Sequence, residues 1–144
     1  MFCFSHFEDN RVYKIIFAIH RYTIFVRLTK MSRAGRGLVR SQIQKLLKEK
    51  KVVVISKSDC PYCNMAKQVL AKYDIPEAIM EITEIDDGQH DGDNIQNVMQ
   101  ELTGARTVPR IFIGGQCIGG GDEIMTMHNN GELEELLRSN AALI

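Results

Sequence analysis

The sequence predicts an α/β fold, a four-stranded mixed sheet flanked by helices on both faces. A short β-branched run, Val52 to Ile55, lies between two segments whose apolar residues recur at helical spacing. A second strand pattern at 78–85 follows the second helix, which makes a β-α-β unit with parallel strands. Gly114-Gly115 separates two short extended segments, as in a two-residue hairpin. A chain of 144 residues, 44% hydrophobic and 25% charged, can bury one such core.

Each element follows from a local pattern. Apolar residues at helical spacing predict a helix over 38–50, and the β-branched run predicts a buried strand. The second helix begins at Pro61 and ends before Pro76, because a residue that precedes proline avoids the α conformation. The later elements, in order, are the strand at 78–85, a helix that ends at Gly104, hairpin strands at 110–113 and 116–119, a short helix from about Asp122 and a final helix around 133–137.

The charge is unevenly distributed, although the formal net charge is zero. Residues 1–37 hold seven Lys or Arg and only two acids, and the excess of acids lies in 38–144. We therefore expect two parts: a basic, aromatic and poorly ordered N-terminal extension over 1–37, and one folded domain over 38–144. The acidic domain argues against nucleic acid as a partner. No uncharged apolar run is long enough for a membrane span.

The extension does not match a secretory signal peptide, because its longest uncharged apolar piece, 15–20, has six residues. A mitochondrial transit peptide is basic and poor in acids, and the Glu8-Asp9 pair departs from that pattern. Met31 is a second candidate start of translation. We expect a cytoplasmic protein, and a mitochondrial address carried by the extension stays open as the alternative.

The motif that indicates catalytic chemistry is Cys60-Pro61-Tyr62-Cys63, between the first strand and the second helix. Proline is favoured at the first helical position, which makes Cys60 the N-cap, whose side chain accepts a backbone hydrogen bond from the first turn. The positive helix end and nearby Lys57 favour a thiolate there. Cys63, one turn further on, is placed to attack a mixed disulfide on Cys60. The pattern therefore predicts a redox site with a nucleophilic and a resolving cysteine.

Other interpretations of these residues fit the sequence less well. A zinc site would need a second ligand pair, and Cys117, His90 and His128 lack the usual spacing, so no metal site is predicted. A calcium loop that starts at Asp87 fails at its twelfth position, which is Val98. Cys117, on the second hairpin strand, is expected to be a small buried hydrophobic residue.

Three motifs in family order show a resemblance: Cys60-Pro61-Tyr62-Cys63, the segment LTGARTVPR at 102–110, and Cys117-Ile118-Gly119-Gly120. On these motifs, residues 38–144 resemble a dithiol glutaredoxin of the thioredoxin-like fold. The resemblance implies a glutathione-dependent thiol–disulfide oxidoreductase that reduces protein–glutathione mixed disulfides and protein disulfides. It also implies glutathione as co-substrate and no tightly bound cofactor.

The resemblance assigns roles to the matched positions. Cys60 and Cys63 would be the catalytic pair, and the Val108–Pro109 bond would be cis and face them. Lys57 and Arg106 would lie near the glycine-end carboxylate of glutathione, Tyr62 would shape the groove, and the γ-glutamyl end would meet the helix start at 120–123. The implied glutathione-binding residues are Lys57, Tyr62, Arg106, Thr107, Val108, Pro109, Gly120, Gly121, Asp122 and Glu123.

The alternative function is an iron–sulfur cluster carrier, in which Cys60 of two chains and two glutathiones hold the cluster. Pro61 argues against it, because cluster-binding relatives usually have Gly or Ser at that position. The expected partners are glutathione, glutathionylated proteins and disulfide-containing proteins, and the chain is expected to be a monomer.

Overall fold

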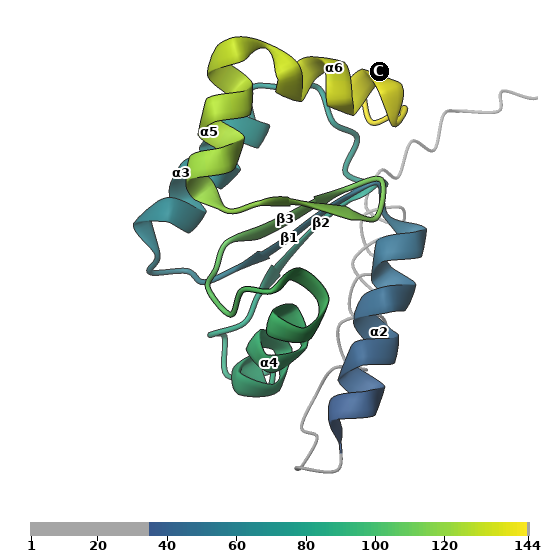
Figure 1. Ribbon diagram of the computed structural model, residues 1–144, viewed down its shortest axis with the longest axis vertical. Helices are drawn as coiled ribbons and strands as arrows, with labels where there is room; N and C mark the ends of the chain where they lie inside the picture. Colours follow the sequence, from purple (N-terminus) through teal and green to yellow (C-terminus); the bar gives the residue numbers. More distant parts are fainter. Residues whose placement is uncertain (1–34, 144) are drawn as a thin grey trace, which may run out of the picture.

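The computed structural model describes residues 35–143, which form a four-stranded sheet between two layers of helices (Figure 1). Most of the predicted extension, residues 1–34, lies outside the described part. Helix α2 begins at Arg36, two residues before the expected start of the domain. The elements are α2 (Arg36–Glu49), β1 (Val52–Ser56), α3 (Pro61–Leu70), β2 (Met80–Glu84), α4 (Gly92–Thr103), β3 (Arg110–Ile113), β4 (Gln116–Gly119), α5 (Gly121–Asn130) and α6 (Glu132–Ser139).

The sheet has the predicted mixed topology, with strand order β2-β1-β3-β4. Strands β1 and β2 are parallel, and Ser56 at the end of β1 lies beside Glu84 at the end of β2. Strand β3 is antiparallel to β1 and forms a hairpin with β4. Gly114 and Gly115 at the hairpin turn both have positive φ, 59° and 81°, as the primed two-residue turns require.

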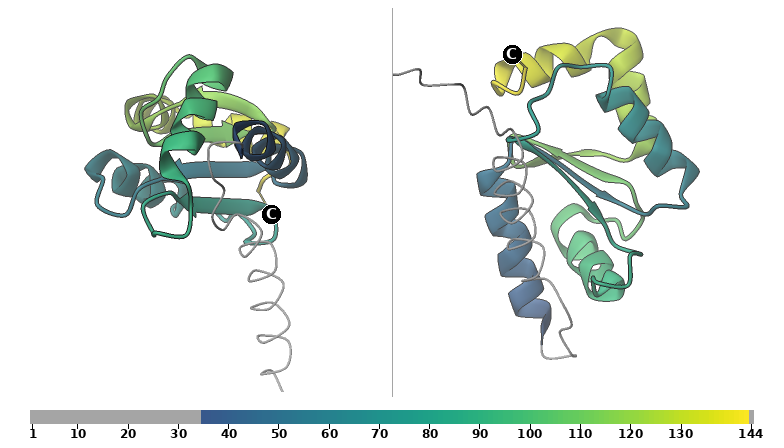
Figure 2. Two further views of the ribbon diagram at one scale, coloured as in Figure 1. Left: turned by 90° about the horizontal axis from the view of Figure 1, so that it is seen from below. Right: turned by 180° about the vertical axis from the view of Figure 1, so that it is seen from behind.

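Two apolar clusters hold the helices on the two faces of the sheet (Figure 2). Because side chains alternate along a strand, Val52 and Val54 of β1 face α3, α5 and α6, whereas Val53 and Ile55 face α2 and α4. By the same alternation Ser56, which is fully buried, continues the row on the α3 side. A polar residue thus ends that apolar row directly below the start of α3.

Cys117 corrects one expectation: it is exposed, and the prediction of a buried cysteine is wrong. Cys117 lies beside Phe112 of β3, so its side chain is on the face that α2 and α4 cover. Strand β4 is the outer strand, and the apolar cluster on that face ends at Phe112. Sequence alternation predicts the face of a residue but not whether a helix extends over the edge of the sheet.

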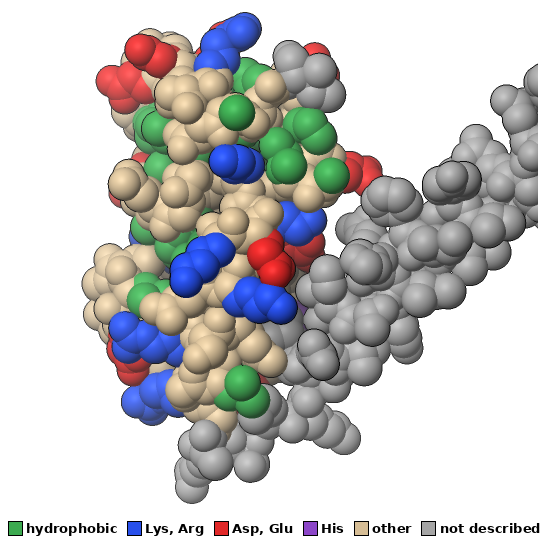
Figure 3. Space-filling view, turned by 90° about the vertical axis from the view of Figure 1, so that its right-hand side faces the viewer, with side chains coloured by type: hydrophobic (Ala, Val, Ile, Leu, Met, Phe, Trp, Pro, Cys, Tyr) green, Lys and Arg blue, Asp and Glu red, His purple; other side chains and the backbone are tan. Residues whose placement is uncertain are grey.

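The sequence divides into a basic segment, 1–37, and an acidic segment, 38–144, but within the described domain basic and acidic side chains gather on different helices. Lys and Arg side chains gather on the face seen in Figure 3. Helix α2 exposes Arg36, Arg40, Lys45 and Lys48, and its two arginines form ion pairs with Glu101 of α4. Acids concentrate in the first turns of α5 and α6. The described domain therefore has a basic helix of its own. Within residues 35–143, no helix has the length and apolar character of a membrane-spanning segment.

Candidate active site

The start of α3 presents Cys60 as the helix N-cap, as the sequence predicts. Cys60 has an extended backbone, with φ −103° and ψ 117°, and Pro61 occupies the first helical position. The backbone N–H of Cys63 donates to the Cys60 sulfur at 3.3 Å. Cys60 is partly exposed, so this sulfur combines access to a substrate with the partial positive charge of a helix N-terminus.

Cys63 is in a different environment, although it is only one turn away. Its side chain is fully buried, and the backbone N–H of Lys57 donates to its sulfur at 3.4 Å. Burial, and to a smaller extent the hydrogen bond with Cys60, raise the pKa of the Cys63 thiol to about 11. At neutral pH Cys63 is a buried thiol in contact with Cys60, which is the arrangement of a resolving cysteine.

The segment before β3 lies against the exposed cysteine. The Cys60 sulfur is 3.9 Å from the carbonyl oxygen of Val108, which is 48 residues away in the chain. The Val108–Pro109 bond is cis, as the resemblance implies, and Pro109 is buried. The Thr107 side chain is directed to Arg110, whose guanidinium donates to the Thr107 hydroxyl at 2.6 Å and to its carbonyl at 2.9 Å.

The start of α5 lies beside the start of α3. Gly121 is buried, and a Cβ atom there would come within 3.1 Å of the Tyr62 Cβ and 3.2 Å of the Met65 Cε. The sequence motif thus places glycine where α5 approaches α3 closely. The Tyr62 side chain itself is exposed, beside Cys60 in sequence, in a position to form one side of a groove.

Glu123 caps its own helix. Its carboxylate accepts a hydrogen bond of 2.7 Å from the backbone N–H of Gly120. That bond holds the pKa of the Glu123 carboxyl below its usual value, and the charge of Arg110 acts in the same direction. The extra methylene of Glu over Asp lets the carboxylate reach back to the N-cap in this way.

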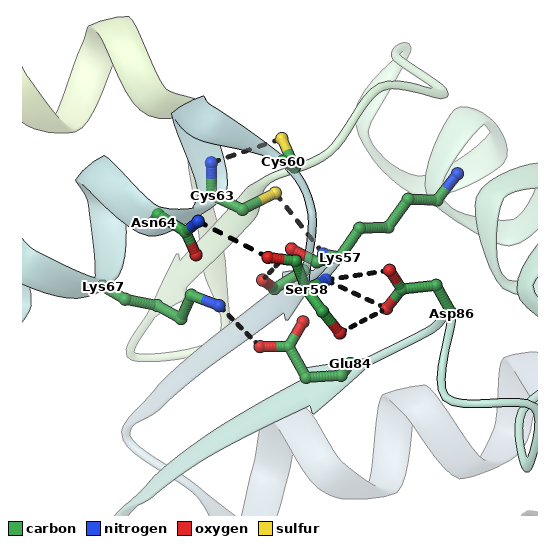
Figure 4. A network of polar contacts seen from close by, with 9 residues as sticks. Lys57, Ser58, Cys60, Cys63, Asn64, Lys67, Glu84 and Asp86 are labelled. Atoms are coloured by element: carbon green, nitrogen blue, oxygen red, sulfur yellow. Dashed lines mark hydrogen bonds and ion pairs between the residues drawn. The ribbon is translucent and has the colours of Figure 1, made fainter.

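The two basic residues of the implied site point elsewhere. The Lys57 side chain extends away from both sulfur atoms (Figure 4). The Arg106 guanidinium hydrogen-bonds Asn97 of α4 and forms an ion pair of 3.0 Å with Asp93. Neither cation touches Cys60, so any role in substrate binding is exerted at a distance from the sulfur. The implied glutathione-binding residues stay a prediction.

Sequence reasoning missed the residue that anchors the loop between β1 and α3. The Asp86 carboxylate accepts from the Ser58 backbone N–H at 2.9 and 3.0 Å and from its hydroxyl at 3.1 Å (Figure 4). The bond from the Ser58 backbone lowers the pKa of Asp86. A signal was present, because parallel strands end at the same edge of a sheet, so a residue that follows β2 lies near the loop that follows β1.

These features define a class of site: an accessible cysteine at a helix N-terminus with a buried partner cysteine behind it carries out thiol–disulfide exchange. Among residues 35–143, no group of three or more His, Cys, Asp or Glu is arranged to hold a metal ion.

Comparisons with known proteins identify the family. A family model described as Glutaredoxin matches residues 52–118. The chain is 43% identical over 93 residues to glutaredoxin-1 of Homo sapiens, which covers 65% of this chain and 87% of that protein. It is 40% identical over 109 residues to glutaredoxin-1 of Sus scrofa, covering 76% and 98%.

Solved structures agree in fold. Oxidised glutaredoxin 2 from Chlamydomonas reinhardtii superposes with a TM-score of 0.70 at 38% identity, covering 76% of this chain and 99% of that one. A buckwheat glutaredoxin–glutathione complex gives 0.71 at 32% identity, covering 79% and 100%. The chain belongs to the glutaredoxin family and has its thioredoxin-like fold.

Proposed function

We propose that this glutaredoxin reduces protein–glutathione mixed disulfides and protein disulfides at the expense of glutathione. The observation that carries the proposal is the difference between its two sulfur atoms. Cys60 is accessible and capped by the helix, whereas Cys63 is buried, with a pKa raised to about 11. One sulfur is therefore the nucleophile and the other enters only after Cys60 has formed a mixed disulfide.

The first reaction needs only Cys60. Its thiolate attacks the glutathione sulfur of a protein–glutathione disulfide, a Cys60–glutathione disulfide forms, and the protein sulfur leaves with the electron pair and takes up a proton. A second glutathione thiolate attacks that same glutathione sulfur and releases oxidised glutathione. When the substrate is a protein disulfide, Cys63 completes the exchange and leaves a Cys60–Cys63 disulfide, which glutathione then reduces.

The surface beside Cys60 is suited to a short anionic peptide. The Val108 carbonyl is beside the reacting sulfur, and Tyr62 and the start of α5 lie on the other side of it. Lys57 and Arg106 supply positive charge at the rim, and Arg106 would exchange or share its contact with Asp93 when a carboxylate binds. The buckwheat relative in a glutathione complex supports glutathione as the ligand.

A glutathione-coupled assay on cysteine variants tests the proposal. Cys60→Ser should abolish activity with every substrate. Cys63→Ser should retain deglutathionylation and lose most reduction of substrates that need two protein thiols. Cys117→Ser is the matched control, because Cys117 is exposed but lies on β4, away from the redox motif in sequence. Mass spectrometry of Cys63→Ser after exposure to oxidised glutathione should locate one adduct on Cys60. An adduct on Cys117, or loss of deglutathionylation in Cys63→Ser, would contradict the assigned roles.

No feature of the described residues and none of the similarities above favours the iron–sulfur alternative. A cytoplasmic location and a monomeric state are further proposals. Fractionation of cells that express the full chain tests the first, and size-exclusion chromatography of the reduced chain tests the second.

A further inference from the structure

An ion pair lies behind the redox motif and takes no part in the reaction described above. The Lys67 ammonium of α3 is 2.7 Å from one carboxylate oxygen of Glu84 at the end of β2, and the two side chains are only 23% and 29% exposed. The other Glu84 oxygen, Oε2, is buried and accepts no hydrogen bond; it is the one such side-chain atom within residues 35–143. The half-buried Glu84 carboxylate therefore has one oxygen paired with Lys67 and one buried oxygen without a hydrogen-bond donor.

This pair is next to Cys63. Lys67 follows Cys63 by four residues on α3, so the two side chains share one side of the helix, with Cβ atoms about 6 Å apart. Glu84 lies beside Ser56 in the parallel register, on the α3 side of the sheet. The Ser56 hydroxyl, which donates to the Lys57 carbonyl at 3.4 Å, lowers the pKa of the Cys63 thiol. Figure 4 shows Lys67 and Glu84 pointing toward one another beneath the loop that carries the cysteines.

We propose that the Lys67–Glu84 pair controls how readily Cys63 forms a thiolate and thereby the share of turnover that passes through the Cys60–Cys63 disulfide. Both are positioning residues, since they act on Cys63 through space. The ammonium favours a negative sulfur and the carboxylate opposes it, so in the intact pair the two effects offset each other. The proposal rests on the two-cysteine route of the proposed function.

Only one step depends on this balance. Cys63 loses its proton to water, and its thiolate attacks the Cys60 sulfur of a Cys60–glutathione disulfide. The Cys60–Cys63 bond forms, the bond to glutathione breaks, and the glutathione sulfur leaves with the electron pair and is protonated. Because burial holds the Cys63 thiol in its protonated form at neutral pH, a small change in local charge changes the rate of this step directly.

The other charged and titratable groups of this region do not replace the pair. Those on the elements around Cys63 are the N-cap Cys60, Tyr62 and Lys67 of α3, Lys57 and Asp59 of the preceding loop, Glu84 and Asp86 at and after the end of β2, Arg110 at the start of β3, and Asp122 and Glu123 at the start of α5. Arg110 is bound to Thr107, and Glu123 is bound to the Gly120 backbone. Asp86 is exposed and bound to Ser58, and Lys57 extends away from the sulfur atoms. Lys67 and Glu84 are thus the charges that lie on the α3 side of the sheet beneath Cys63.

The test compares Glu84→Gln with Lys67→Gln. Glu84→Gln leaves the ammonium alone and should speed closure of the Cys60–Cys63 disulfide, whereas Lys67→Gln leaves the carboxylate alone and should slow it. Each change should be on the order of threefold to tenfold, the size of one charge acting over several ångströms near a protein surface. The reduced chain is mixed with oxidised glutathione, quenched in acid at intervals from pH 6 to 9, and resolved by mass spectrometry into adduct and closed disulfide.

Three controls separate this role from a structural one. The double variant should return close to the parent rate, and Glu84→Asp, which keeps the charge, should resemble the parent. In a Cys63→Ser background, where no disulfide can close, both variants should form the Cys60–glutathione adduct at the parent rate. The proposal is overturned if both single variants change closure in the same direction, if neither changes it, or if the two variants change adduct formation in opposite directions without Cys63. Failure of Cys60 to form any glutathione adduct would instead contradict the proposed function.

Discussion

At the scale of single residues, two cysteines three positions apart differ because of where the helix begins. Pro61 fixes the first turn and leaves Cys60 outside it, at the positive helix end and in contact with solvent. Cys63 belongs to that turn and is fully buried, with its sulfur accepting a hydrogen bond from the Lys57 backbone. The division of labour between nucleophile and resolving thiol is thus a consequence of helix capping and of burial.

The Cys63 thiol predicts how stability depends on pH. Its pKa is about 11 in the folded chain, against an ordinary value of 9.0 that applies to the unfolded chain. The unfolded chain therefore releases this proton first, and the stabilising contribution of the buried thiol is complete below pH 9 and lost as pH rises toward 11. Denaturant unfolding of the reduced protein should show a loss on the order of 2 kcal/mol across this interval, from a shift of this size. Cys63→Ser, measured over the same pH range, should lack this part of the loss; an identical pH dependence in both proteins would contradict it.

Lys57 predicts a change in substrate use that is separate from sulfur reactivity. Because its ammonium extends away from both sulfur atoms, Lys57→Gln should raise the KM for glutathione by about twofold to fivefold, as expected of one exposed charge. Alkylation of Cys60 in this variant by iodoacetamide, a neutral reagent, should proceed at the parent rate. Lys51→Gln, an exposed lysine just before β1, is the matched control. If alkylation of Cys60 by iodoacetamide slows by the same factor by which KM rises, Lys57 acts on the thiolate itself.

At the scale of elements, the hairpin and α5 depend on glycine where no side chain fits. Gly119 has φ 124°, and a Cβ there would lie 2.6 Å from the Glu123 Cγ. Gly119→Ala should therefore displace Glu123 from the Gly120 backbone and destabilise the fold by about 1–3 kcal/mol, the usual cost of overpacking. Gly37→Ala is its control, because Gly37 is helical with nothing within 4 Å of its Cβ position. That change should be neutral or stabilise by up to about 1 kcal/mol. Thermal unfolding of both variants measures the difference. Equal effects on stability would show that the close contact with Glu123 does not destabilise the fold.

The elements also show what the sequence can and cannot predict. Periodicity and turn residues predict the mixed sheet, the parallel β1–β2 pair and the cap at Cys60, because each depends on residues close together in the chain. Partnerships between distant elements were missed. Lys67 with Glu84, and Asp86 with the loop at Ser58, depend on how α3 and the β1–α3 loop sit over the ends of the strands. Cys117 was placed wrongly for a related reason, since the edge of a helix layer leaves no local pattern.

At the scale of the whole molecule, the groups assigned to the proposed reaction lie in the described domain. The cysteine pair, the Val108 carbonyl and the start of α5 all lie within residues 35–143, and the two apolar clusters that support them lie there too. Helix α2 carries basic side chains, so the described domain has positive surface charge of its own. The fold and the site therefore form one unit that residues 1–34 precede.

A chain that begins at Met31 should consequently retain full activity. It keeps the whole of α2, whose Val39 and Ile43 belong to the apolar cluster beneath β1 and β3. We expect kcat/KM in a glutathione-coupled assay within about twofold of the full chain, because the contacts of Cys60 and Cys63 described above are all made by residues between 57 and 108. A chain that begins at Gln44 is the matched control: it removes Val39 and Ile43 from the core and should lose several kcal/mol of stability, the scale of deleting large buried side chains. A loss of more than about tenfold in the Met31 chain, which corresponds to about 1.4 kcal/mol of barrier, would show that the extension helps to build the site.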